Sequence, residues 1–304
     1  MTDIKDNTIR LTVFTPTYNR MTTLERTFKS LQEQTCKDFL WMIIDDGSTD
    51  HTAEKVRKWQ KMDTGFEIRY YYKENGGMHT AHNEAYRHIT TELNVCIDSD
   101  DLLAPDAVRQ ILAKWNQVKN SQRIAGIIAL DADLEGNIIG KGFPEGLMET
   151  TVCGYYARGG NGDKKLIYRT DIINRYPEYP VFEGEKYVSL AYKYRLIDQE
   201  YMMSVLNEIV CYVDYQPDGS SNSMLKQYLR NPKGFAFWRT ILLKFPSEDS
   251  EKRQFINCVH YVSSSMLSGN RHFIKESPRK GLTIAAVPFG LVLTAYIKVK
   301  TGKR

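Results

Sequence analysis

Apolar runs of strand length alternate with segments of helical periodicity through the first 130 residues, and this alternation limits the possible folds. Runs rich in β-branched and aromatic residues are bounded by turn signals, as buried strands usually are. They are TIRLTVF (8–14), FLWMIID (39–45), FEIRYYY (66–72), LNVCI (93–97) and IAGIIAL (124–130). Strands separated by helices of this length predict a parallel sheet with helices on both faces.

The intervening segments carry the expected helices. Leu24, Phe28 and Leu31 recur at helical spacing, and a polar helix is expected from about Thr52 to Trp59. Another is expected through residues 81–89. A further helix follows Pro105, a favourable first-turn residue, with these apolar positions: Val108, Ile111, Leu112 and Trp115.

Composition excludes several classes of protein. The 304 residues carry a net charge of +4, too small to demand a nucleic-acid partner. The five cysteines are scattered and form no CxxC pair, which argues against a disulfide framework and a zinc site and fits a reducing cytoplasm. The first residues lack a basic segment followed by an apolar core, so we expect no secretory signal.

Polar residues gather where the first four strands end. The segments are TPTYNR (15–20), DDGSTD (45–50), ENGGMHTAHN (74–83) and DSDD (98–101). Ligands of parallel sheets bind outside the carboxyl ends of the strands, so these loops are expected to share one site. There Tyr18 can stack on a base, Asp46 can accept a base N–H, and the acidic cluster can hold a divalent cation against a diphosphate.

These motifs, in this order, resemble the family 2 glycosyltransferases of the GT-A fold over roughly residues 8–215. The resemblance implies an α/β fold, with a mixed, mostly parallel sheet flanked by helices and a helical C-terminal extension. It implies a DxD motif that binds Mg²⁺ or Mn²⁺, with Asp100 as direct ligand and Asp98 at the ribose or a metal-bound water. The residues implied to contact the nucleotide-sugar are Pro16, Thr17, Tyr18, Asp46, Asn75, Gly76, Asn83, Asp98 and Ser99.

Several of these residues have structural interpretations as well. Asp46 can shape an Asx turn, as we expect for Asp45. Residues 75–77 can form a tight turn with positive φ, with ligand contact as a secondary role. The histidines in this region are expected to serve surface or hydrogen-bonding roles, because an acidic cation site needs no imidazole; they are His79, His82 and His88.

The resemblance also implies a general base that deprotonates the acceptor hydroxyl. Its usual Glu-Asp pair is replaced here by EGEK (183–186). We predict Glu185 as the base and Glu183 as the alternative, because a cationic Lys186 cannot accept a proton without a strongly depressed pKa. Either glutamate can instead favour a helix start through the macrodipole.

The chain is expected to divide into a catalytic domain and a helical C-terminal region. The catalytic domain spans 1–220, with nucleotide-sugar binding in 8–130 and an acceptor and base region in 131–220, of which residues 131–182 are expected to be loop-rich. Asp218, Ser220 and Ser221 can close over the diphosphate or simply form a turn. The helical region spans 221–304.

The end of the chain combines apolar and basic character. From Leu282 to Ile297 it carries no charge, and basic residues flank this stretch on both sides. A membrane span needs about 20 apolar residues, and we expect Pro288 to interrupt this one. Residues 279–304 are therefore interpreted as an interfacial segment attracted to anionic headgroups, or equally as a buried helix with a basic tail.

The function implied is metal-dependent, inverting transfer of a sugar from a nucleotide-diphosphate sugar, UDP-sugar first, to a saccharide or lipid-linked saccharide. The resemblance implies a role in surface polysaccharide or glycolipid synthesis. The scattered cysteines and the apolar, basic tail predict a cytoplasmic protein peripheral to the membrane. A nucleotidyltransferase would be expected to show a glycine-rich basic loop after the first strand, and a dinucleotide oxidoreductase would show GxGxxG there. The segment TPTYNR at this place matches neither motif. A non-catalytic nucleotide-sugar-binding protein is an alternative function, because Lys186 lies in the segment that aligns with the base motif.

Overall fold

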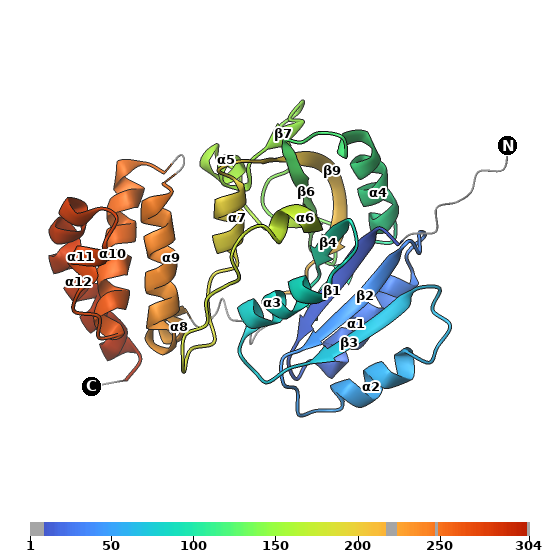
Figure 1. The fold of residues 1–304 in the computed structure, drawn as a ribbon, viewed down its shortest axis with the longest axis horizontal. Helices are drawn as coiled ribbons and strands as arrows, with labels where there is room; N and C mark the ends of the chain where they lie inside the picture. Colours follow the sequence, from blue (N-terminus) through green and yellow to red (C-terminus); the bar gives the residue numbers. More distant parts are fainter. Residues whose placement is uncertain (1–8, 217–223, 247–248, 303–304) are drawn as a thin grey trace. The chain divides into compact units, whose positions relative to one another are not determined.

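The computed structural model describes residues 9–216, 224–246 and 249–302, which fall into two compact units (Figure 1). The sheet unit comprises Met1–Asn75, Ala81–Tyr176 and Glu200–Tyr215. The helical unit comprises Gly76–Thr80, Pro177–Gln199 and Gln216–Arg304. The domain boundary expected at residues 220 and 221 lies outside the described residues, as do Asp218, Ser220 and Ser221.

In the described residues, nine strands form one mixed sheet with the order β3-β2-β1-β4-β8-β6-β9-β5, and β7 pairs with β9. β1, β2, β3 and β4 run parallel, as do β6 and β9, whereas β8 is antiparallel to both of its neighbours. The sheet is therefore mixed and mostly parallel, as expected. The strands are β1 (Leu11–Thr17), β2 (Phe39–Asp45), β3 (Glu67–Tyr72), β4 (Leu93–Cys96), β5 (Leu102–Leu103), β6 (Ile124–Ala132), β7 (Glu149–Thr150), β8 (Lys164–Arg169) and β9 (Met202–Tyr212).

Helices cover both faces of this sheet, because the central strands bury side chains in both directions. In β2 all seven residues are buried: Trp41 packs with Phe28 of α1 and Trp59 of α2, while Met42 points to the other face. On that other face, Phe14 of β1 makes edge contacts with His82 and Tyr86 of α3. The helices are α1 (Met21–Gln32), α2 (Thr52–Trp59), α3 (Met78–His88), α4 (Ala107–Val118), α5 (Val152–Ala157) and α6 (Thr170–Ile173).

The region expected to be loop-rich supplies a strand in the middle of the sheet. β8 lies between β4 and β6, where it buries Ile167 and Tyr168. Its first two residues are Lys164 and Lys165, so its sequence lacks the apolar run that marks the other central strands. Their ammonium groups find partners only in the folded chain, which is why the pattern predicted a loop here.

The helical unit is built around α10, which packs against both α9 and α12. Its small core consists of Leu243, Cys258, Tyr261, Val262 and Ala286. The helices are α7 (Ala191–Ile197), α8 (Met224–Arg230), α9 (Pro232–Lys244), α10 (Glu251–Leu267), α11 (Phe273–Glu276) and α12 (Lys280–Lys300).

Pro288 does not interrupt the last helix, contrary to the prediction. α12 runs continuously through it from Lys280 to Lys300. Pro288 lies on the exposed side of the helix, where water can satisfy the carbonyl that loses its N–H partner. The helix is therefore long and apolar enough, by length and composition, to cross a membrane.

Strand register brings the polar loops to one edge of the sheet. Thr17 at the end of β1 is paired with Asp45 at the end of β2, and Asp45 with Tyr72 at the end of β3. On the other side of β1, Phe14 is paired with Cys96, the last residue of β4. The loops after all four parallel strands therefore begin at the same edge, as the sequence predicted.

Candidate functional site

The loops after β1 and β2 are held together by Asn19. Its backbone N–H donates to Ser48 Oγ at 2.9 Å, and its Oδ1 accepts the backbone N–H of Thr49 at 2.7 Å. Asn19 has a φ of 51°, a left-handed conformation that asparagine tolerates better than most residues. Beside this junction Tyr18 leaves 47% of its surface exposed, so its ring is available to a ligand.

The two aspartates after β2 have different surroundings. Asp45 accepts the backbone N–H of Ser48 at 2.7 Å and the hydroxyl of Tyr70 at 2.6 Å, so it shapes the turn as expected. Burial and the hydrogen bond to Asp45 raise the pKa of Tyr70, which keeps this hydroxyl a donor. Asp46 is 5% exposed and belongs to a different network.

Asp46 is paired with a lysine that the sequence analysis did not single out. Lys73 Nζ lies 2.6 Å from Asp46 Oδ1, and Asn75 Nδ2 donates to the backbone oxygen of Asp46 at 2.8 Å. The Lys73 ammonium thus pairs with the carboxylate that was predicted to contact the base. Lys73 directly follows β3, so its place at a strand end was the available signal.

The other predicted contacts from these loops are largely buried. Pro16 and Thr17 end β1, and the Thr17 hydroxyl has no hydrogen-bond partner among the described residues. Asn83 on α3 is 4% exposed, and Ser99 after β4 is 8% exposed. Pro16, Thr17, Asn83 and Ser99 therefore leave little of their surface exposed.

The glycine pair at 76 and 77 has a structural role within the helical unit. Gly77 has a φ of 92°, as the tight-turn interpretation predicted. A Cβ at Gly77 would lie 2.1 Å from the backbone oxygen of Lys186, so a side chain there would collide with the EGEK segment. Gly76 directly precedes it.

Three aspartates crowd the loop after β4. Burial raises the pKa of Asp98, with a further contribution from the charge of Asp100 and an opposing one from Lys165. Burial and the charge of Asp101 raise the pKa of Asp100, and burial likewise raises that of Asp101. The folded chain therefore holds these negative charges close together at an energetic cost that a cation would relieve.

A buried lysine lies behind this cluster. Lys165 Nζ on β8 is 3.5 Å from Asp101 Oδ2 and 3.9 Å from Asp131 Oδ2 at the end of β6. Burial acts to lower the pKa of Lys165, but the surrounding carboxylates outweigh it and raise that pKa well above its usual value. Burial also raises the pKa of Asp131 to about 6. Lys165 thus joins the acidic loop to the neighbouring strand.

The acidic loop carries the kind of donor that a hard divalent cation prefers. Its donors are carboxylate oxygens, which Mg²⁺ and Mn²⁺ prefer. Within the described ranges, no three His, Cys, Asp or Glu side chains converge closely enough to hold a metal by themselves. Mg²⁺ typically takes one or two carboxylates plus substrate phosphates, and Asp98 with Asp100 offers that number.

The two candidate bases lie in the helical unit and differ sharply in their contacts. Glu185 accepts the backbone N–H groups of Lys233 at 2.9 Å and Gly234 at 2.8 Å, in the first turn of α9. The backbone N–H of Lys186 donates to Asn231 Oδ1 at 2.8 Å, just before the same helix. Glu183 is exposed. Glu185 therefore serves the start of a helix, although of a different helix from the one considered in the sequence.

Two of the three histidines on α3 have the hydrogen-bonding roles expected. His82 Nδ1 lies 3.3 Å from the Tyr86 hydroxyl, and its Nε2 lies 3.6 Å from Cys96 Sγ. His88 Nε2 lies 2.9 Å from Glu84 Oε1. His79 is buried at 1% exposure.

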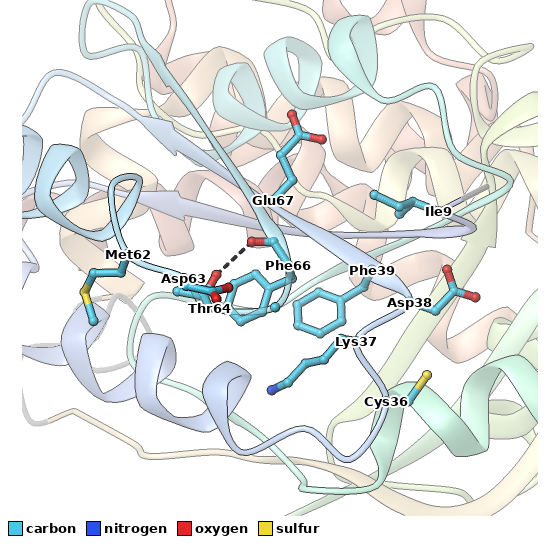
Figure 2. Close-up of a pocket in the computed structure, with 11 residues that line it drawn as sticks. Ile9, Cys36, Lys37, Asp38, Phe39, Met62, Asp63, Thr64, Phe66 and Glu67 are labelled. Carbon is cyan, nitrogen blue, oxygen red and sulfur yellow. Dashed lines mark hydrogen bonds between the residues drawn. The ribbon is translucent and has the colours of Figure 1, made fainter. Parts of the chain in front are cut away.

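An open cavity of about 840 Å³ lies at the other edge of the sheet (Figure 2). Residues at the amino ends of β2 and β3 line it, among them Lys37, Phe39 and Phe66. The Lys37 ammonium donates to the backbone oxygen of Leu31 at 3.2 Å, at the end of α1, so it helps to close that helix. This cavity is remote from the motif-bearing loops.

The motif-bearing region is similar to a family of known proteins. Residues 12–136 match the model of the glycosyl transferase family 2. Over 110 residues the chain is 33% identical to GalNAc(5)-diNAcBac-PP-undecaprenol beta-1,3-glucosyltransferase of Campylobacter jejuni, covering 36% of this chain and 35% of that protein. Over 107 residues it is 36% identical to validoxylamine A glucosyltransferase of Streptomyces hygroscopicus, covering 34% of this chain and 25% of that protein. The match thus spans about a third or less of these relatives.

Solved structures share the fold over nearly the whole chain. TarS residues 1–349 of S. aureus, in complex with UDP-GlcNAc, align with a TM-score of 0.60 at 15% identity, covering 97% of this chain and 92% of that one. The mannosyltransferase PcManGT of Pyrobaculum calidifontis, in complex with GDP-Man and Mn²⁺, aligns with a TM-score of 0.56 at 17% identity, covering 96% and 89%. The motif-bearing residues of this chain therefore match the family 2 glycosyltransferase model, and the chain shares the fold of these solved structures.

Proposed function

We propose that this protein transfers a sugar from a nucleotide-diphosphate sugar to a hydroxyl acceptor, with inversion at the anomeric carbon. A UDP-sugar is the first candidate for the donor. The observation that carries the proposal is the convergence of three groups at one sheet edge within a family 2 domain. An exposed Tyr18 can stack on a base, the lysine-paired Asp46 can accept a base N–H, and the acidic loop can meet a diphosphate through a cation.

We propose distinct roles in donor binding for the two DxD carboxylates. Asp100 would hold Mg²⁺ or Mn²⁺ directly, and Asp98 would contact the ribose or a metal-bound water. When bound, the cation supplies Lewis-acid stabilisation of the departing diphosphate. Pro16, Thr17, Asn75, Gly76, Asn83 and Ser99 complete the proposed nucleotide-sugar site. PcManGT, which was solved with GDP-Man and Mn²⁺, supports a divalent cation.

The acceptor proton would pass to a carboxylate of the EGEK segment. Glu185 is the first candidate from sequence, but both of its oxygens accept backbone N–H groups, which supports a capping role. The carboxylate of Glu183 is exposed, and among the described residues no hydrogen bond joins it to α9. It can therefore approach an acceptor hydroxyl. We therefore assign proton abstraction to Glu183 and keep Glu185 as the alternative.

The acceptor is proposed to be a saccharide, free or linked to a lipid, in the synthesis of surface polysaccharide or glycolipid. The Campylobacter relative, whose name includes an undecaprenol-linked substrate, supports a lipid-linked acceptor. Location in the cytoplasm, with the tail at residues 279–304 in contact with the membrane surface, would bring the enzyme to such an acceptor.

The decisive experiment measures release of UDP or GDP from a panel of nucleotide-sugars with Mn²⁺, with and without EDTA. We expect UDP release that EDTA abolishes and that Asp100→Asn lowers by at least about a hundredfold, with unchanged melting. Asp63→Asn, an exposed aspartate of the other edge, is the matched control. If the protein binds UDP-sugars but releases no nucleotide under any condition, it is a non-catalytic nucleotide-sugar-binding protein instead.

A further inference from the structure

α12 leaves a long apolar face uncovered. Residues Thr283, Ala286, Gly290, Thr294 and Ile297 are buried, at the spacing of one helical face. The other side exposes Ile284, Phe289, Leu291, Val292, Tyr296 and Val299, from 46% of the surface for Leu291 to 79% for Val299. Monomeric soluble proteins rarely leave so extended an apolar surface in water, so this face needs an occupant.

We propose that this outer face of α12 docks in the plane of an anionic membrane surface, without spanning the bilayer. Charge complementarity identifies the occupant. Arg279 and Lys280 flank the apolar face at one end, Lys298 and Lys300 flank it at the other, and all four are exposed. α12 contains no acidic residue, so nothing on the helix opposes attraction to acidic headgroups.

The packing of α12 on α10 favours the in-plane orientation over a spanning one. At about 1.5 Å per residue the 21 residues extend about 31 Å, so length alone permits a span. The inner face, however, is fixed to α10 along most of its length. A Cβ on Gly290 would lie 2.4 Å from Val262, and the Thr294 hydroxyl donates to Ser263 Oγ at 3.1 Å.

α10 cannot follow its partner across a bilayer. Its first turn carries Glu251, Lys252 and Arg253, all exposed, and it buries the amides of Gln254 and Asn257 within the helical unit. Charged side chains at the centre of a bilayer are strongly disfavoured. Insertion parallel to the surface satisfies both helices, because the outer face of α12 enters the acyl boundary while α10 stays on the aqueous side.

Basic residues at both ends of the apolar face agree with this orientation. In a helix parallel to the surface, both ends lie at the depth of the headgroups, where cations are favourable. The inference extends the proposed membrane location from contact of a basic tail to insertion of a defined helical face. Membrane binding is measured without any nucleotide-sugar. Failure of the proposed transfer activity would therefore not contradict this inference.

The test is co-sedimentation of the full chain with vesicles of phosphatidylcholine containing phosphatidylglycerol, compared with vesicles of phosphatidylcholine alone. We expect binding to the anionic vesicles that high salt weakens. Lys298→Gln with Lys300→Gln should lower the partition coefficient about twenty-five-fold, because each cation near an anionic surface contributes about fivefold. Val292→Glu should abolish binding, and Met148→Glu should not, although Met148 on the sheet unit is similarly exposed.

Each remaining outcome overturns the inference. Bound protein that resists extraction by alkaline carbonate would indicate a spanning helix. Equal binding to both vesicle types would show that the apolar face does not require an anionic membrane surface. A stable dimer in the absence of vesicles, dissociated by Val292→Glu and indifferent to lipid, would show that a second copy of the chain covers this face. Wild-type melting of Val292→Glu confirms that loss of binding does not reflect unfolding.

Discussion

The carboxylate of Glu185 accepts the backbone N–H of Gly234 at 2.8 Å, although 49 positions separate the two residues. Its second oxygen accepts the neighbouring N–H of Lys233, so one side chain satisfies two of the unpaired donors that begin α9. The negative charge also opposes the positive end of the helix dipole. This contact gives the residue first predicted as the general base a structural role as well, because it joins a loop to a helix.

Replacing each of the two glutamates of this segment by glutamine, in separate variants, distinguishes a catalytic role from a helix-capping role. Glu185→Gln is expected to lower the free energy of unfolding by about 1 kcal/mol and to leave transfer nearly normal, since the amide keeps one acceptor oxygen. Glu183→Gln is expected to lower transfer by about a hundredfold to ten-thousandfold with unchanged melting. Initial rates and melting curves of both variants provide the measurement.

A backbone variant serves as the control for the capping contact. A Cβ on Gly234 would lie 2.0 Å from the backbone oxygen of Tyr187, so Gly234→Ala must displace the segment that holds Glu185 while keeping its carboxylate. It should destabilise the protein by about 1–3 kcal/mol. If Glu185→Gln instead loses transfer and melts like the wild type, Glu185 is the base and the assignment to Glu183 is wrong.

The nucleotide pocket is tested at Tyr18 and Asp46. Tyr18→Ala should weaken UDP binding between about fivefold and a hundredfold, because stacking of one base on an aromatic ring contributes about 1–3 kcal/mol. Asp46→Ala should also weaken UDP binding, since it removes the acceptor and the carboxylate that pairs with the Lys73 ammonium. Isothermal titration calorimetry measures both. Tyr296→Ala, at 48% exposure close to that of Tyr18, should bind UDP normally; wild-type affinity in both pocket variants would place the nucleotide elsewhere.

The buried lysine behind the acidic loop is expected to govern stability. Lys165→Met leaves Asp101 and Asp131 without their shared cation, and breaking such a buried pair typically costs about 3–5 kcal/mol. Lys165→Met with Asp131→Asn should recover part of that loss, because the second change removes one of the uncompensated charges. Urea unfolding of the single and double variants measures the coupling. Additive losses would show that the lysine acts independently of Asp131.

His260 is expected to make the protein sensitive to acid. Burial, with a smaller contribution from the charge of Arg239, lowers its pKa from 6.5 to about 4. Since the folded pKa lies below the unfolded one, the unfolded chain takes up the proton first as the pH falls. Stability is therefore lost between about pH 6.5 and pH 4, by up to about 3 kcal/mol.

Replacement of this histidine checks the pH effect. His260→Gln should flatten the decline in unfolding free energy over that range, as measured by urea titrations at pH 7, 5.5 and 4.5. His272→Gln, an exposed histidine of the same unit, should retain the wild-type decline. An unchanged slope in His260→Gln would show that His260 does not cause the decline.

Features encoded over a few neighbouring residues were predictable from the sequence. Periodicity located β1, β2 and the helix from Thr52 to Trp59, because a strand or helix buried on one or two faces repeats its apolar residues at a fixed interval. The turn role of Asp45 and the positive φ of Gly77 followed from local backbone chemistry. Parallel strands then placed the polar loops at one edge of the sheet.

Features that depend on partners distant in the chain were decided by the tertiary structure alone. β8 reads as a loop because Lys165 finds its carboxylates only when strands from three separate segments meet. The Lys73–Asp46 pair spans 27 positions, and the Glu185 contact with α9 spans 48 or more. A local pattern reports which residues seek burial, whereas the stability of a buried charge or an unpaired N–H group depends on the partner that the fold brings to it.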